Sequence, residues 1–494
     1  MCEFNIQEIE LFNYRQFEDK KFVLNSRMNV FAGKNGSGKT TVLEAANVVL
    51  GAYLAAFKTY VPSRFVFNIK STDARRKTQI SDDSRILTAG AIPQYPCKVS
   101  CKAAWNIDYE SIGFQRVLLK QDGRTKFGGK NPMQQTVIEW ESKIANADHS
   151  DEDVILPLVL YLSSARLWKD GNKRTVKTGV LSRTDAYSHC LDAQHGLDIA
   201  FRYIDTLKAV AVEENDGKIF PAYEVILWAV NEAFRDELKS GEKIIFSTKY
   251  EDDIIALRTS EGTVLPFQML SDGYRNVIKI ILDIAARMCI LNPYLKEKAL
   301  QETPGIVLID EIDLSLHPAW QRDFVDYLVA YINSCYKENN VQIIMTTHSP
   351  LCLSNFPSSN IIYLRKTENG TEVDLSEHKE TFGTNLYEIL DDAFYLGCDS
   401  MGRFARKYIQ KVIEEIMELS YLNQEDYYRY KQKIGCIGDT LIRNKLGEQL
   451  SKKLKETEGQ RVAVDAIDKE IKQLELRRKK ITEEMSGSTK ISEE

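Results

Sequence analysis

The sequence lacks the features that would place a protein in a membrane or in an oxidising compartment. No window reaches the roughly 18 uninterrupted apolar residues that a membrane span requires, and long apolar runs such as Val154–Leu162 have the length of a buried strand. The first residues, Met1–Asn5, carry an acid early and lack the basic and apolar parts of a signal peptide. The nine cysteines are scattered over 494 residues, which is typical of reduced thiols. These absences predict a cytoplasmic protein that does not bind a membrane.

An excess of basic residues is also missing. The net charge is −6, with 28% charged and 43% apolar residues, as in an ordinary folded protein. Any contact with nucleic acid must therefore be local or be made by a partner. A local candidate is the cluster Lys70, Arg75, Arg76 and Lys77, although a solvated loop explains these charges more simply.

A strand, a glycine-rich turn and a helix follow one another near the N-terminus. The apolar run Met28–Phe31 leads into Gly33-Lys34-Asn35-Gly36-Ser37-Gly38-Lys39-Thr40-Thr41, and a helical run covers Thr40–Ala56. This is the P-loop pattern G-x-x-x-x-G-K-T in the context that it requires. Backbone N–H groups must wrap the phosphates, so glycines keep side chains out of the loop. We expect Lys39 to reach the β- and γ-phosphates of ATP and Thr40 to complete the Mg²⁺ shell.

Two further strand ends carry polar side chains. The apolar run Ile306–Ile309 ends in Asp310 and Glu311, and Ile343–Met345 ends in Thr346-Thr347-His348-Ser349. A buried strand rarely ends in paired acids without a role, because desolvating two like charges is costly. We expect Asp310 to hold Mg²⁺ and Glu311 to orient or deprotonate the attacking water. His348 is expected to contact the γ-phosphate.

A second anion-binding surface is predicted at Leu270-Ser271-Asp272-Gly273-Tyr274-Arg275, which opens a helical run at 274–295. Ser271 and Gly273 would present the positive end of that helix. Taken alone, Ser-Asp-Gly is an ordinary helix cap. One nucleotide does not need two phosphate cradles in one chain, but two chains do need them if each cradle caps the nucleotide of the other.

The order of these motifs resembles that of the ABC-type ATPases of the SMC, RecF and OLD group. The resemblance implies an α/β fold of a P-loop NTPase head, with a mixed sheet flanked by helices, and a head-to-head dimer in which Ser271 and Gly273 contact the γ-phosphate in trans. Asp313 matches the D-loop at that dimer interface. Arg15, in Asn13-Tyr14-Arg15, matches a phosphate or base contact. The Q-loop glutamine of the family has no recognisable counterpart.

The chain is expected to have two parts. Residues 1–395 would form the ATPase head, with a helical and irregular insertion at about 55–260, and residues 121–150 within it read as an exposed loop. Residues 396–494 have no strand signal and predict a C-terminal all-helical region for partner binding or oligomerisation. Its last helix carries apolar residues at heptad spacing, with Arg478 in one slot: Ile467, Ile471, Leu474, Ile481 and Met485.

The insertion contains no long heptad run, which excludes SMC-type arms, and no Toprim pattern follows residue 350, so no intrinsic nuclease is expected. Over roughly residues 5–395 the chain resembles the PtuA-like ATPases of Septu and retron anti-phage systems, and the helical tail matches them less distinctly. The stretches that carry this resemblance are Tyr161–Trp168, Ser182–Asp192, Leu291–Pro293, Ile309–Pro318 and Thr381–Gly383.

Members of that family assemble with an HNH nuclease (PtuB-like) and, in retrons, also with a reverse transcriptase and its DNA product. The resemblance therefore implies an ATPase that acts as sensor and scaffold while a partner cuts. The alternative is a RecF-like repair ATPase that acts directly on DNA.

Overall fold

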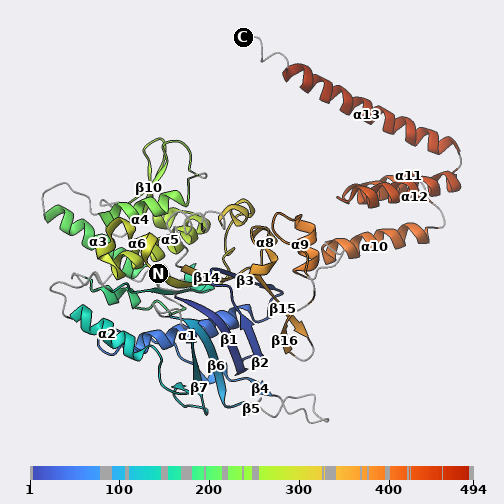
Figure 1. Cartoon of the computed structure of the whole chain (residues 1–494). Coiled ribbons are helices and arrows are strands. Elements are labelled where there is room, and N and C mark those ends of the chain that lie inside the picture. The colour runs from blue at the N-terminus through green and yellow to red at the C-terminus, as the bar shows by residue number, and fades with distance from the viewer. Residues whose placement is uncertain are drawn as a thin grey trace. The chain divides into compact units, whose positions relative to one another are not determined.

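The computed structural model describes residues 4–77, 92–105, 111–145, 154–167, 181–193, 196–213, 221–235, 238–246, 255–324, 328, 341–367, 370–374, 376, 378–394, 401–419, 422, 424–458 and 460–488 (Figure 1). The chain divides into two compact units, Met1–Gly397 and Cys398–Glu494. Among the described residues, no helix is long and apolar enough to span a membrane.

The first unit is built on a six-stranded sheet with the order β16-β15-β3-β14-β13-β9. Its strands are β3 (Met28–Gly33), β9 (Leu158–Leu162), β13 (Gly305–Ile309), β14 (Val341–Thr346), β15 (Ile361–Thr367) and β16 (Gly370–Val373). All neighbours pair in parallel except β15 and β16. Strands β9, β13 and β14 are buried along their whole length, as continuous apolar runs require in a parallel sheet.

A second, antiparallel sheet has the order β2-β1-β6-β7-β8. Its strands are β1 (Asn5–Tyr14), β2 (Phe17–Val23), β6 (Cys97–Ala104), β7 (Ser111–Leu118) and β8 (Lys126–Phe127). Helix α1 (Lys39–Leu54) contacts strands of both sheets and is buried on almost every side. This explains why its sequence has no polar face.

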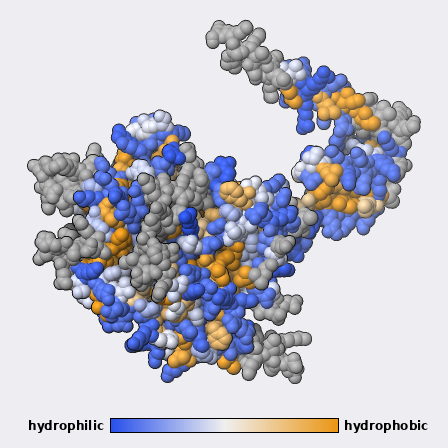
Figure 2. Space-filling view, viewed as in Figure 1, coloured by the Kyte–Doolittle hydropathy of each residue, from blue (hydrophilic) through white to orange (hydrophobic). Residues whose placement is uncertain are grey.

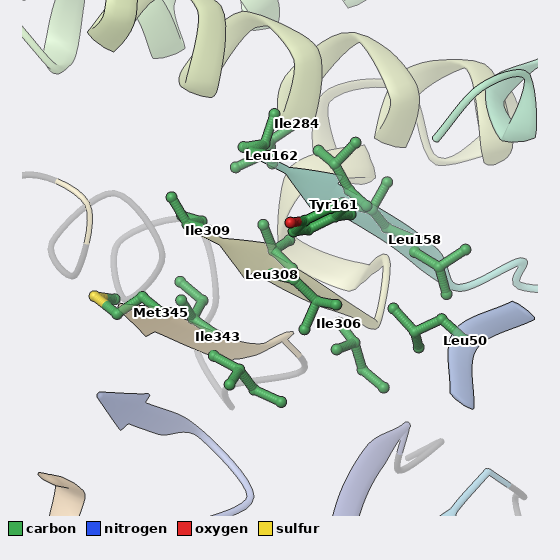
Figure 3. Packing of buried hydrophobic residues seen from close by; sticks show 14 of the residues in the cluster. Leu50, Leu158, Tyr161, Leu162, Ile284, Ile306, Leu308, Ile309, Ile343 and Met345 are labelled. Atoms are coloured by element: carbon green, nitrogen blue, oxygen red, sulfur yellow. The ribbon is translucent and has the colours of Figure 1, made fainter. Parts of the chain in front are cut away.

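Helix α5 (Asp272–Leu291) packs against β9 with the helices α3 (Asp198–Glu213) and α4 (Pro221–Glu232) beside it. Figure 3 shows Ile284 of α5 beside Leu162 of β9, with Leu50 of α1 in the same apolar cluster. Buried on the sheet in this way, α5 carries the predicted second anion-binding surface at its N-terminal end. The mixed sheet with flanking helices confirms the predicted α/β class.

The remaining elements of this unit are short. A small antiparallel sheet joins β10 (Lys243–Phe246), β11 (Ile255–Arg258) and β12 (Val264–Pro266), and a ribbon joins β4 (Arg76–Lys77) and β5 (Ile92–Pro93). The short α-helices are α6 (Ala299–Glu302), α8 (Pro350–Leu353) and α9 (Leu386–Asp392). The 3-10 turns are Ser63–Phe65, Ser71–Asp73, Ser164–Leu167, Arg183–Tyr187, Phe267–Met269, Pro293–Lys298 and Ser358–Asn360.

The expected loop at 121–150 is wrong for Gln134–Ala145, which form helix α2. Val137 and Glu141 lie one turn apart and are both buried. One Glu141 carboxylate oxygen accepts the N–H groups of Lys58, Thr59 and Tyr60 at 3.1, 2.9 and 3.2 Å. The helix is thus fixed by a contact with the segment after α1, which a local pattern does not reveal.

The second unit is helical, as predicted, with α10 (Arg403–Glu418), α11 (Gln424–Gly435), α12 (Thr440–Glu458) and α13 (Gln460–Ser488). It has a small core of its own, formed by Ile409, Val412, Ile416, Leu422, Tyr427, Tyr430, Ile434, Ile437, Leu446, Leu450 and Leu454. The heptad residues of α13 do not join this core: Ile467, Ile471, Leu474 and Ile481 are exposed, and Figure 2 shows hydrophobic surface along this helix. The side chain of Met485 lies outside the described residues.

Candidate active site

The P-loop lies between the end of β3 and the start of α1, at the carboxyl edge of the six-stranded sheet. Gly33 has a φ of +141°, and a Cβ there would lie 2.2 Å from the carbonyl oxygen of Leu364 on β15. Gly38 has a φ of +92° and precedes α1 without a side-chain cap. The N–H groups of the first helical turn are therefore left for an anion. The buried Ser37 hydroxyl likewise finds no partner within the described part of the chain.

Lys39 is the cation of this loop. Its Nζ donates to the carbonyl oxygens of Gly33 and Lys34 at 2.7 and 3.1 Å. Burial lowers the pKa of Lys39 to about 8, although Asp310, Glu311 and Asp313 act in the opposite direction. A desolvated ammonium group at a helix N-terminus is the chemistry that a polyphosphate requires.

The Asp310 carboxylate joins the P-loop to the ends of two strands. It accepts the hydroxyl groups of Thr40, at 3.0 and 3.1 Å, and of Thr346, at 2.7 Å. Hydroxyl and carboxylate oxygens are the hard ligands that Mg²⁺ prefers. Thr40 and Asp310 are therefore the residues that would hold the ion.

Glu311 follows Asp310 with a left-handed backbone, φ 49°. Its N–H donates to the Thr346 hydroxyl at 2.7 Å, and its side chain lines the pocket described below. Burial, followed by the neighbouring Asp310 and Asp313, raises the pKa of the Glu311 carboxyl. A raised pKa makes a carboxylate a better proton acceptor near neutral pH.

Asp313 orients the segment that carries His348. One Asp313 oxygen accepts the Thr347 hydroxyl at 2.7 Å and the His348 N–H at 3.2 Å. His348 lines the pocket, and burial together with Lys39 lowers the pKa of its imidazole. A neutral imidazole can donate one hydrogen bond toward a phosphate.

These groups surround a pocket of about 630 Å³. It is lined by Arg15, Gln16, Asn35, Gly36, Gly38, Lys39, Thr40, Thr41, Glu311, His348, Lys366 and Thr371. Three of these residues, Gln16, Lys366 and Thr371, were not predicted from the sequence. Gln16 directly follows the predicted Arg15, and its Oε1 accepts the Thr41 hydroxyl at 3.1 Å. Lys366 and Thr371 enter because β15 pairs with β3, which no local signal indicates.

Arg15 lies at the rim of the pocket and is already engaged. Its guanidinium donates to Asp73 at 2.9 and 3.0 Å and forms an ion pair with Glu44, whose pKa is raised by burial. The structure thus places Arg15 at the pocket but holds it on two carboxylates. A contact with a nucleotide would compete with these pairs.

Ser271 and Gly273 are not among the residues that line this pocket. Ser271 is exposed at the N-terminus of α5 and makes no capping bond with its side chain. Gly273 lies against Ser315 and Trp320, which follow the Asp310–Asp313 segment. Neither residue therefore belongs to the phosphate pocket of its own chain.

The basic cluster is partly neutralised. Arg75 and Lys77 both pair with Glu18, at 2.9 and 3.4 Å, and the Lys70 ammonium lies 5.2 Å from the centre of the Phe67 ring. One carboxylate is thus shared by two of the four cations, so the cluster keeps part of its positive charge.

The loop, the acidic strand end and the buried lysine together define a P-loop ATPase. Two family models match the chain: "AAA domain" over residues 8–245, and "AAA domain, putative AbiEii toxin, Type IV TA system" over residues 140–354. Trp168, at the end of one stretch that carries the family resemblance, lies outside the described residues.

Among curated proteins, the chain is similar to the Retron Ec83 probable ATPase of Escherichia coli, with 23% identity covering 74% of this chain and 72% of the relative. It is also similar to the Septu protein PtuA of Bacillus thuringiensis, with 22% identity covering 87% and 93%. The Retron Vc95 probable ATPase of Vibrio cholerae is 38% identical over 132 residues, 26% of this chain and 23% of that protein. The predicted resemblance to the retron and Septu ATPases is thereby confirmed.

Among solved structures, the Smc head bound to the C-terminal winged-helix domain of ScpA matches with a TM-score of 0.42 and 15% identity, covering 75% of this chain and 97% of that one. The SMC head domain from Thermotoga maritima matches with a TM-score of 0.38 and 12% identity, covering 76% and 99%.

The low pKa of Lys39 predicts how nucleotide binding depends on pH. In the free protein this pKa is about 8, and phosphate oxygens beside the ammonium group would raise it. Binding then takes up a proton above pH 8, so affinity is full below about pH 8 and falls above it by up to roughly tenfold per pH unit. Titration with a fluorescent ATP analogue at pH 7, 8 and 9 measures this, with thermal unfolding as a check of the fold. An affinity that stays constant up to pH 9 would contradict a desolvated Lys39 at the phosphates.

Proposed function

We propose that this ATPase closes head-to-head dimers around Mg-ATP and serves as the sensor and scaffold subunit of an anti-phage defence complex that controls a separate HNH nuclease. The observation that carries the dimer is the position of Ser271. It lies exposed at a free helix N-terminus, outside the pocket that holds Lys39 and Glu311. A cradle that does not reach the phosphates of its own chain can serve those of a second copy. The defence role is supported by the relatives named retron ATPase and Septu PtuA.

In each composite site, the P-loop N–H groups and Lys39 would bind the transferring phosphoryl group. Glu311 would orient and deprotonate the attacking water, and His348 would donate toward the γ-phosphate. Thr40 and Asp310 would hold Mg²⁺, which when bound would neutralise charge on the phosphate oxygens. Ser271 of the partner subunit and the helix behind it would cap the γ-phosphate, so that turnover depends on closure.

The apolar stripe of α13, formed by Ile467, Ile471, Leu474 and Ile481, is where we propose that the nuclease docks. Acidic residues flank this stripe at Glu470 and Glu475, and in a parallel two-helix coil a second copy would place these like charges opposite each other. A partner helix with basic residues beside its apolar face would pair with Glu470 and Glu475, so it would bind the stripe more tightly than a second copy of α13.

Replacing Leu474 by glutamate is therefore expected to reduce partner recovery roughly tenfold or more, because a charge replaces a side chain worth about 1.5–3 kcal/mol when buried. ATP hydrolysis should be unchanged. Leu476 provides a matched control, since it is equally exposed (61% against 59%) on a different face of the same helix. The measurement is the amount of nuclease that co-purifies with each variant from native-host lysate. Equal loss from both variants would argue against the stripe.

The experiment that tests the whole proposal is purification from the native host at low salt with Mg-ATP, followed by identification of bound components. A small HNH-type protein, with or without a reverse transcriptase and DNA, is the expected result. A protein that purifies alone and hydrolyses ATP faster with DNA would instead favour the RecF-like reading.

A further inference from the structure

Arg166, in the turn after β9, bonds to the backbone of the hydrolytic centre. The residue is only 4% exposed. Its Nη1 donates to the carbonyl oxygens of Asp310 and Ser163 at 2.6 and 2.9 Å, and its Nη2 donates to the carbonyl oxygen of Glu311 at 2.8 Å. The guanidinium thus holds the two peptide units at the point where the backbone of Glu311 turns left-handed.

This buried cation forms no ion pair with the carboxylates that the structure describes; its partners are carbonyl and amide oxygens. Burial lowers the pKa of Arg166 to about 10, against the opposing effect of Asp310 and Glu311, so it stays charged at neutral pH. Hydrogen bonds from a charged donor are shorter and stronger than those between neutral groups. The planar fork of arginine reaches several acceptors at once, which a lysine cannot do.

The same guanidinium connects this centre to the helix of Ser271. Its Nε donates to the Asn276 Oδ1 at 2.7 Å, and the Asn276 Nδ2 donates to the carbonyl oxygen of Leu314 at 2.8 Å. Asn276 is fully buried on α5, five residues after Ser271. Lys279, on the same helix, donates to the Arg166 carbonyl oxygen at 3.1 Å. A movement of the N-terminal turns of α5 must therefore shift the segment that carries Glu311.

We propose that Arg166 and Asn276 are positioning residues that transmit contact at Ser271 to Glu311, so that hydrolysis starts only when the second subunit has closed. The proposal rests on the proposed dimer for its trigger. The positioning of Glu311 stands on the contacts of Arg166 and Asn276 alone. A continuous chain of hydrogen bonds joins Asn276, Arg166 and Glu311 in a packed interior, where displacement of one group moves the next.

The test is the replacement Asn276→Ala, which removes the bonds of this side chain to Arg166 and Leu314 but leaves the Lys279 bond and the bonds of Arg166 to Asp310 and Glu311. We expect kcat to fall roughly tenfold to a hundredfold, because small misplacements of a catalytic group cost this much. The Kd of a fluorescent ATP analogue should stay within about twofold, since no P-loop contact changes. Closed dimers should accumulate with ATP, because ATP still binds and closes the dimer while the hydrolysis that would reopen it is slow.

A second variant, Asn276→Asp, keeps the size of the side chain and the acceptor but removes the donor to Leu314. It should also lose kcat without losing affinity. Arg287→Lys is the matched control on the same helix: Arg287 is 1% exposed and donates from Nε to Asp283 at 2.7 Å and from Nη1 to the carbonyl oxygen of Ser188 at 3.1 Å. This control should lower thermal stability and leave kcat of the folded protein unchanged.

Folded Asn276 variants that retain kcat within twofold would overturn the proposal, as would a parallel loss of kcat and affinity like that of a general folding defect. Failure of the dimer is recognised separately. Turnover per subunit would then be independent of protein concentration, while an Asn276 variant with reduced kcat would still establish the positioning of Glu311 within one chain.

Discussion

The replacement Glu311→Gln is expected to leave ATP binding intact and to reduce turnover by roughly two to four orders of magnitude, the usual contribution of a general base. The amide keeps the shape of the side chain but cannot accept the proton of the attacking water. It also removes one negative charge beside Asp310 and Asp313, the two carboxylates that raise the pKa of Glu311. ATP should therefore bind at least as tightly as to the unaltered protein.

Phosphate release measures the turnover, and light scattering after size exclusion measures the closed dimers that should accumulate with ATP. Glu302→Gln is a suitable control, because Glu302 pairs only with Lys298 at the surface among its described contacts. Hydrolysis at the ordinary rate by the Glu311 variant would end the assignment of this residue.

The second large effect is expected from Ser271→Arg. The long side chain blocks the anion-binding end of α5 at the point where a second subunit would meet the γ-phosphate. ATP affinity should persist, ATP-driven closure should disappear, and turnover should fall roughly a hundredfold or more, as after loss of a donor to the transition-state charge. Ser260→Arg, on the exposed turn between β11 and β12, is the control for adding an arginine to the surface.

Mixing variants tests the trans arrangement directly. A Ser271→Arg subunit keeps an intact P-loop, and a Lys39→Ala subunit keeps an intact Ser271. Each alone should be inactive, whereas mixed dimers hold one complete site and should recover part of the activity. If Ser271→Arg alone hydrolyses ATP normally, each chain works by itself and the trans model is wrong.

Motifs that depend on local geometry could be predicted from the sequence. The P-loop needs glycines at fixed positions of one strand-turn-helix unit, and Asp310 and Glu311 end a strand that is apolar enough to be recognised. Burial on both faces also follows from such runs. For these residues the neighbouring sequence largely determines the local backbone geometry and the burial of the strand.

Other parts of the site depend on contacts between distant segments. Lys366 and Thr371 reach the pocket because Ile361 pairs with Val30, more than 300 residues away in the chain. Arg166 has no local signature, since its acceptors are carbonyl oxygens that any residue could provide. Helix α2 was missed for a similar reason: Glu141 is fixed by N–H groups that follow α1.

Helix α1, enclosed by both sheets, determines which parts of the ATPase can respond to its ligand. A rod clamped between two layers cannot tilt unless one layer separates from it, and close packing makes that costly. The P-loop at the N-terminal end of α1 is therefore expected to keep its position when nucleotide binds. Conformational change during binding and hydrolysis is expected instead in the residues that follow β13 and β14 and in the first turns of α5.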